Sequence, residues 1–90
     1  MCGIYKITNL INQKSYIGQS VNIEARWKKH RNIYNKTKDK SYNYPLYKAF
    51  RKYGLDKFSF EILEECLVTE LNERERYWIS YYNTFFQGYN

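Results

Sequence analysis

Two ionisable residues stand where the surrounding helical pattern otherwise places apolar side chains. Apolar residues recur at the helical period between Ile23 and Tyr34, and His30 occupies one place of that stripe, with Arg26 one turn before it. Glu75 occupies the equivalent place in a second stripe, between Leu71 and Tyr82. An ionised group among apolar neighbours is costly unless a partner or a metal compensates it. A single carboxylate with waters is a usual way to hold magnesium, so metal binding is one chemistry that this pattern allows.

Glu75 has two interpretations on this pattern alone: it is a metal ligand, or it is one half of a buried structural ion pair with Arg26.

The two cysteines, Cys2 and Cys66, form no C-x-x-C pair, and His30 is the only histidine. A structural zinc site needs about four such ligands, so zinc is close to excluded.

Positive charge is concentrated in the middle of the chain. The protein has a net charge of +6, but residues 26–57 hold eleven Lys and Arg against two Asp, whereas residues 58–90 hold two Arg against six Glu. Such a basic segment favours a polyanionic partner, and the candidate contacts to a nucleic-acid backbone are Lys28, Lys29, Lys48 and Lys52. The alternative is a solvated charged face that only keeps the protein soluble.

The residues Gly-Ile-Tyr at 3–5 are repeated in mirror order at 16–18, on either side of a predicted hairpin turn. The turn is Asn12-Gln13 if turn chemistry sets the pairing, and Leu10-Ile11 if the mirror symmetry sets it. The two registers differ by an even number of residues, so both tyrosines project from one side of the hairpin in either case. We expect the glycines to leave a shallow place beside the phenols where a ligand backbone can approach. Alternatively, the tyrosines simply pair across a hairpin.

The remaining pattern predicts an α+β domain with a small sheet, in the order β-β-α-α-β-α. The predicted strands cover 4–8, 15–19 and 58–65, and the predicted helices cover 23–34, 45–53 and 70–82. Asn22 is the expected N-cap of the first helix, while Pro45 and Gly54 bracket the second. We expect 35–44 to be a loop, and the closing TFFQGYN to be irregular and to pack back through its aromatic residues. Nothing divides the chain, so 1–90 is expected to be one domain.

These residues together resemble the GIY-YIG nuclease domain, most of all the catalytic domain of phage and intron homing endonucleases. The resemblance covers essentially the whole chain and rests on the mirrored tripeptides, Arg26 with His30, Glu75 before Trp78-Ile79, the segment LYKAFRKYG and the closing Gly88-Tyr89-Asn90. It implies a three-stranded antiparallel sheet flanked by helices. It also implies a DNA endonuclease that hydrolyses phosphodiester bonds of double-stranded DNA with one Mg²⁺ or Mn²⁺ ion per site, its target selected by a separate domain or partner.

The resemblance implies a catalytic site of six residues: Tyr5, Tyr16, Arg26, His30, Glu75 and Asn90. Glu75 would hold the metal, Arg26 would bind phosphate oxygens through two parallel donors, and Tyr16 would bind the phosphate or a metal-bound water. Tyr5 is the candidate to orient the attacking water or take its proton. His30 would hold or deprotonate Tyr5, or act on the water itself. Asn90 would position its neighbours.

One departure from the family concerns the loop after the first helix, where some homing members carry a second histidine and this chain has none. Asp39, Ser41 and Tyr42 are the residues that could stand in its place. Two other functions stay open: a non-catalytic nucleic-acid-binding module on the same scaffold, and a structural or protein-interaction domain with incidental basic charge. No apolar run is long enough for a signal peptide or a membrane span, so we expect a cytoplasmic protein without a membrane partner.

Overall fold

A three-stranded antiparallel sheet forms the centre of the structure, a computed structural model that describes residues 1–90. The strand order is β2-β1-β3, with β1 (Gly3–Asn9) between β2 (Ser15–Ser20) and β3 (Phe58–Glu65). The helices are α1 (Ile23–Ile33), α2 (Pro45–Tyr53), α3 (Leu71–Tyr82) and α4 (Thr84–Gln87). Short 3-10 turns at Leu55–Lys57 and Val68–Glu70 lead into β3 and α3. The α+β class and the predicted order of elements are confirmed.

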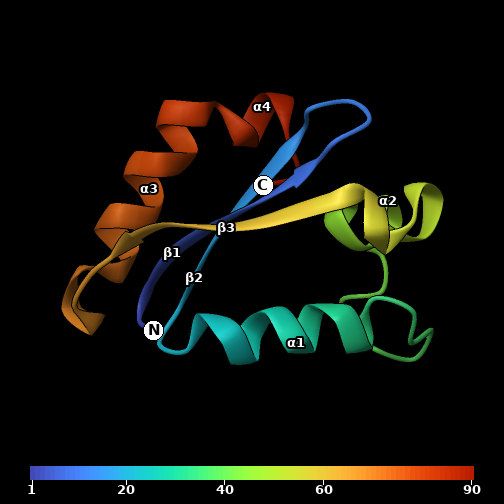
Figure 1. The fold of residues 1–90 in the computed structure, drawn as a ribbon, viewed down its shortest axis with the longest axis horizontal. Coiled ribbons are helices and arrows are strands. Elements are labelled where there is room, and N and C mark those ends of the chain that lie inside the picture. Colours follow the sequence, from blue (N-terminus) through green and yellow to red (C-terminus); the bar gives the residue numbers. More distant parts are fainter.

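The two faces of the sheet carry separate apolar clusters. Tyr5 and Ile7 of β1 pack with α1 and α2 on one face, whereas Ile4, between them in the alternation, packs with Ile17 of β2 and Leu71 of α3 on the other. Figure 1 shows α1 and α3 on opposite sides of the sheet. Because β2 is an edge strand, side chains from the two faces can approach each other around its free edge.

The local signals for the helices are largely confirmed. The Asn22 side chain accepts a hydrogen bond from the backbone N–H of Ala25 at 3.1 Å, as an N-cap does. Pro45 is the first residue of α2, and Gly54 follows its end with a φ of 92°, a value that favours glycine. The observed α1 ends one residue before the predicted limit, and α3 starts one residue late, after a 3-10 turn. No helix of the protein combines the length and the apolar character needed to cross a membrane.

The register of the β1–β2 hairpin differs from both predicted registers. Tyr5 faces Gly18, and the last hydrogen-bonded pair of the hairpin is Asn9 with Lys14. The four residues Leu10–Gln13 form the loop inside this pair, and Gln13 has a φ of 65°. The Asn9 side chain accepts a hydrogen bond within this loop and so starts the turn earlier than Asn12-Gln13 would. The loop still contains an even number of residues, and Tyr5 and Tyr16 therefore share a face, as predicted.

The expectation that the two glycines leave room for a ligand is wrong. A Cβ on Gly18 would overlap the ring of Tyr5, and a Cβ on Gly3 would overlap the carbonyl oxygen of Glu64 in β3. The space beside these glycines is thus already filled by the protein. The first glycine permits the β1–β3 pairing, and the second leaves room for the Tyr5 ring against β2.

The C-terminal segment differs in part from the expectation. Residues 84–87 form the short helix α4, which follows Asn83 in the left-handed conformation, with a φ of 55°. Phe85 and Phe86 are 66% and 81% exposed, so the tail does not pack back through them. The buried Thr84 and the half-buried Tyr89 make the return contacts instead.

Candidate active site

A buried histidine joins two tyrosines on the face of the sheet that α1 and α2 cover. The Tyr5 hydroxyl lies 2.9 Å from His30 Nε2, and the Tyr47 hydroxyl lies 2.7 Å from His30 Nδ1. None of the three side chains is more than 2% exposed. Burial, with the charges of Arg26 and Lys29, lowers the pKa of His30 to about 3, while burial raises the pKa of Tyr47 to about 12 and that of Tyr5 further still. Near pH 7 this chain of hydrogen bonds is therefore uncharged.

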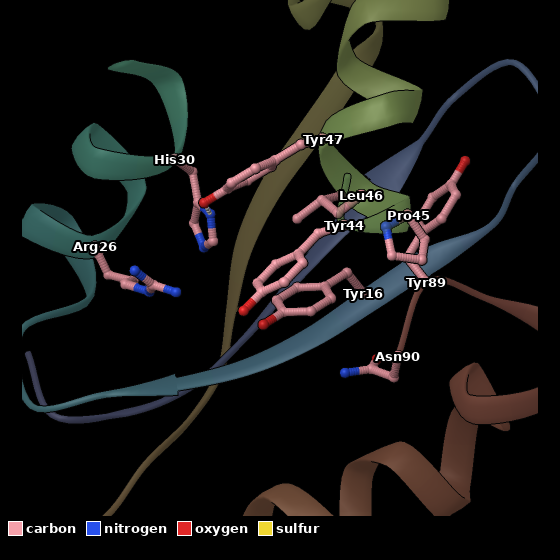
Figure 2. A pocket seen from close by; sticks show the side chains of 9 residues that line it. All are labelled: Tyr16, Arg26, His30, Tyr44, Pro45, Leu46, Tyr47, Tyr89 and Asn90. Atoms are coloured by element: carbon pink, nitrogen blue, oxygen red, sulfur yellow. Dashed lines mark hydrogen bonds between the residues drawn. The ribbon is translucent and has the colours of Figure 1, made fainter. Parts of the chain in front are cut away.

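A pocket of about 220 Å³ opens in front of this chain (Figure 2). Its lining residues are Tyr16, Arg26, His30, Tyr44, Pro45, Leu46, Tyr47, Tyr89 and Asn90. Four of the six predicted catalytic residues thus meet at one pocket, from β2, α1 and the C-terminus. Tyr5 does not line it, because its ring lies behind the surface with the hydroxyl turned to His30. Of the two mirrored tyrosines, Tyr16 is the one that faces the pocket.

Arg26 is the charged group of this pocket. Figure 2 shows it reaching from α1 toward the tyrosines on the other side. Its charge lowers the pKa values of both Tyr5 and Tyr16, against the larger effect of burial, which raises them. No carboxylate pairs with Arg26, so the predicted alternative of a structural ion pair with Glu75 is wrong. An unpaired guanidinium beside phenol hydroxyls is suited to binding phosphate oxygens.

Glu75 is not among the lining residues of the pocket, because α3 packs on the opposite face of the sheet. The carboxylate is half-buried and makes no ion pair. Burial raises its pKa, and hydrogen bonding to the Gln19 side chain partly opposes the rise. The charge of Glu75 also raises the pKa of Tyr16, secondary to burial, so the two groups lie within electrostatic reach around the edge of β2.

The surroundings of Glu75 fit one hard cation rather than a metal cluster. A half-buried carboxylate without a positive partner is uncompensated, and a divalent ion would compensate it. The protein contains no group of three or more His, Cys, Asp or Glu placed to hold a metal. The remaining ligands would then be water and phosphate oxygens, which is the coordination that Mg²⁺ tolerates.

Asn90 forms hydrogen bonds along the free edge of β2. Its Nδ2 donates to the Ile17 carbonyl and its Oδ1 accepts from the Ile17 N–H, both at 2.7 Å. The backbone N–H of Tyr89 donates to the Ser15 carbonyl at 2.9 Å. The Asn90 side chain thus holds the backbone of Ile17, and the backbone of Tyr89 holds that of Ser15. Together these two C-terminal residues fix the backbone on either side of Tyr16, which agrees with a positioning role for Asn90.

Tyr47 and Tyr44 belong to the pocket although nothing in the sequence pattern had singled them out. Tyr47 precedes Phe50 by about one helical turn. If Tyr47 had been included in the apolar stripe of this helix, helical periodicity would have predicted that its side chain points inward. Tyr44 lies just before α2, in the segment predicted to be a loop, and its ring stacks on that of Tyr47 with centroids 6.1 Å apart. No helical period could have placed that residue.

Two of the three candidates for the missing second histidine stand near the pocket. Asp39 accepts hydrogen bonds from the backbone N–H and the hydroxyl of the buried Ser41, in a hollow that adjoins the pocket. Tyr42 instead lies against Arg51, whose guanidinium carbon is 3.7 Å from the ring centroid. Of the three candidates, Asp39 and Ser41 therefore lie next to the pocket, whereas Tyr42 lies against Arg51.

Three of the four lysines proposed to bind a nucleic-acid backbone lie in hollows that adjoin the pocket. Lys29 lines the hollow of Asp39 and Ser41, which shares Arg26 with the pocket. Lys48 and Lys52 line a more open hollow on the other side, together with Lys14 at the hairpin. Lys28 is exposed and lines none of these hollows.

The chain matches one known domain family and is similar in sequence to two endonucleases. A family model described as the GIY-YIG catalytic domain matches residues 1–90. The chain is 38% identical over 90 residues to intron-associated endonuclease 1 of Enterobacteria phage T4, covering 98% of this chain and 36% of that protein. It is 42% identical over 62 residues to probable intron-encoded endonuclease 1 of Neurospora crassa, covering 69% of this chain and 18% of that protein.

Among solved structures, the chain is similar to the catalytic domain of the homing endonuclease I-TevI. The TM-score is 0.85 at 36% identity, and the match covers 100% of this chain and 97% of the solved one. The phage relative is much longer, since the chain spans only 36% of its length. The similarity thus extends over the whole of a solved catalytic domain and over about a third of a full-length relative.

Proposed function

This chain belongs to the family of GIY-YIG catalytic domains, and from that premise we propose that it is the catalytic domain of a DNA endonuclease, which hydrolyses phosphodiester bonds with a divalent metal ion. One observation carries the proposal: Arg26, which has no carboxylate partner, lines a single pocket together with Tyr16 of β2, the buried His30 and Asn90. Residues 1–90 would form a single catalytic domain in the cytoplasm, and a further part of a longer protein, or a partner, would select the DNA site.

Arg26 and Tyr16 are assigned to the phosphate. The guanidinium presents parallel N–H donors to two phosphate oxygens, and it is free to do so because no carboxylate holds it. Its charge also stabilises the extra negative charge that develops on the phosphoryl oxygens in the transition state. Tyr16 adds a hydroxyl donor from the opposite wall of the pocket.

Glu75 is assigned to the metal, with Mg²⁺ or Mn²⁺ as the ion. When bound there, one such ion would polarise the phosphate and stabilise the leaving oxygen. Glu75 itself supplies the negative charge that would hold the ion. Asn90 keeps the β2 backbone in place between this carboxylate and the pocket.

The chain Tyr5–His30–Tyr47 is assigned to support and orientation. In the free protein neither candidate is an effective general base near pH 7. Burial raises the pKa of Tyr5, so its hydroxyl stays protonated, and lowers the pKa of His30 to about 3, so its ring takes up a proton only weakly. Tyr5 is also buried away from the pocket. His30, which lines the pocket, can offer a fixed hydrogen-bonding edge to the attacking water or the phosphate, and its ring is held by a hydroxyl on each nitrogen.

Tyr47→Phe tests this supporting chain. The substitution removes the hydroxyl bound to His30 Nδ1 and leaves a buried ring nitrogen without a partner. A lost hydrogen bond of this kind corresponds to roughly 1 kcal/mol, so the single-turnover cleavage rate should fall by roughly fivefold while the affinity for DNA is unchanged. Tyr34→Phe is the matched control, because that half-buried hydroxyl has no hydrogen-bond partner in the structure. Equal rates for the two variants would contradict the assignment.

DNA affinity should depend steeply on salt. Each lysine contact to a backbone phosphate contributes about 0.9 to the slope of log affinity against log salt concentration. The double variant Lys48→Ala/Lys52→Ala should therefore lower the slope measured by fluorescence anisotropy in EDTA, whereas Lys28→Ala, outside the hollows, should leave it unchanged. A salt-independent affinity would be incompatible with the electrostatic contacts.

The proposed function is separated from its alternative by incubating supercoiled plasmid with the purified protein, with Mg²⁺ and with EDTA. Metal-dependent nicking supports the endonuclease. Binding to the plasmid without nicking favours a non-catalytic nucleic-acid-binding module on the same scaffold. Absence of both would favour a structural or protein-interaction domain.

A further inference from the structure

A small polar hollow adjoins the pocket on the side of the loop that joins α1 to α2. It has a volume of about 140 Å³ and is lined by Arg26, Lys29, Ile33, Asp39, Lys40, Ser41, Tyr44 and Tyr47. We call it the loop hollow. Three of its residues, Arg26, Tyr44 and Tyr47, also line the main pocket, so the two spaces share a wall.

The loop hollow has an excess of positive charge. Its cations are Arg26, Lys29 and Lys40, and its only carboxylate is Asp39. Asp39 is engaged by the backbone N–H and the hydroxyl of Ser41, and these hydrogen bonds, followed by the charges of the two lysines, lower its pKa. None of the three cations forms an ion pair. They are thus near the carboxylate without being neutralised by it.

Because the two spaces share a wall, a phosphate in the loop hollow would lie next to a phosphate bound in the main pocket. Arg26 can face a phosphate in the main pocket or one in the loop hollow, since its side chain lines both. Tyr44 is 54% exposed at the boundary, so a chain that links two phosphates could pass over its ring. A DNA strand carries one phosphate per nucleotide, and neighbouring phosphates of one strand are the anions that two adjoining sites would take.

We propose that the loop hollow is a second phosphate subsite, which binds the backbone phosphate next to the one being cleaved through Lys29 and Lys40. This proposal rests on the proposed function. The subsite would fix the position of the strand relative to Arg26, in addition to any general attraction from the basic surface. The open hollow of Lys14, Lys48 and Lys52 differs, because it has no buried polar wall and does not include Arg26.

A nucleotide with two phosphates is the direct probe. Deoxythymidine 3′,5′-bisphosphate presents neighbouring phosphates at the spacing of one nucleotide, and the 3′- and 5′-monophosphates present one each. Binding to the full chain with Mg²⁺ is measured by NMR chemical-shift titration, for the wild type, for Lys29→Ala/Lys40→Ala and for Lys48→Ala/Lys52→Ala. The two double variants lose the same charge, so they separate the subsite from general electrostatics.

We expect the bisphosphate to bind the wild type at least about tenfold more tightly than either monophosphate, as charge-assisted hydrogen bonds to a second phosphate provide. This advantage should vanish in Lys29→Ala/Lys40→Ala and persist in Lys48→Ala/Lys52→Ala, with the shift of the Ser41 amide following it. No advantage in the wild type, or equal loss in both variants, would overturn the subsite. Plasmid nicking by the wild type is measured in parallel, so that failure of the endonuclease proposal is recognised separately.

Discussion

Glu75→Gln is expected to lower the single-turnover rate of DNA cleavage by at least about a thousandfold. Metal stabilisation of developing charge supplies several kcal/mol, and each 1.36 kcal/mol corresponds to about tenfold in rate. The amide keeps the shape of the side chain but loses the charge that would attract the ion. DNA affinity in EDTA should change little, because Glu75 lies outside the main pocket and the basic hollows.

The same variant also separates a metal ligand from a structural residue. Glu75 has no cationic partner, so removing its charge should leave the thermal midpoint unchanged or slightly higher, whereas breaking a buried ion pair would lower it. Glu73→Gln, an exposed position on the same helix, is the control for a change of net charge. If Glu75→Gln cut DNA at the rate of Glu73→Gln, the metal assignment would be wrong.

Arg26→Lys is expected to reduce the cleavage rate by about a hundredfold or more, although the positive charge is kept. Removing one well-placed donor to a transition-state oxyanion costs roughly 10²–10³ in rate, and an ammonium cannot reproduce the paired geometry of the guanidinium. The loss should appear in the rate at saturating DNA more than in the affinity, because the basic hollows remain.

Arg31→Lys is the matched control for this substitution. Arg31 is on the same helix, but it is exposed and its guanidinium lies against the ring of Phe60, 4.5 Å from the centroid, rather than at the pocket. The control should cleave at nearly the wild-type rate. Near-wild-type cleavage by Arg26→Lys as well would mean that the guanidinium fork is not used.

Helical periodicity predicted the inward direction of His30 and the position of Arg26 beside it. His30 stands in the buried stripe of α1, and Arg26 beside it lines the pocket, because a single helix fixes the relative directions of residues four apart. The alternation of side chains along the two paired strands likewise predicted that Tyr5 and Tyr16 lie on one face of the sheet. Both inferences depend only on the geometry of one element or of two strands joined by a short loop.

Contacts between distant elements were not predictable in this way. Periodicity gave Glu75 an inward direction on α3 but not the face of the sheet against which α3 packs. The hydrogen bond between Tyr47 and His30 joins α2 to α1. The segment 34–44 that connects these helices is aperiodic, so no local pattern predicts the path of this segment. The ring of Tyr5 filling the space beside Gly18 is likewise a cross-strand contact, and it depends on a register set by the Asn9 side chain.

The most direct test of the account measures plasmid nicking by the purified chain as a function of Mg²⁺ concentration. If Glu75 holds one ion per site, we expect no nicking in EDTA, a hyperbolic rise to saturation with Mg²⁺, and no metal-dependent rise in Glu75→Gln. Nicking in EDTA, a sigmoidal dependence on metal, or an unchanged curve for Glu75→Gln would contradict a site that hydrolyses DNA with a single ion held by Glu75.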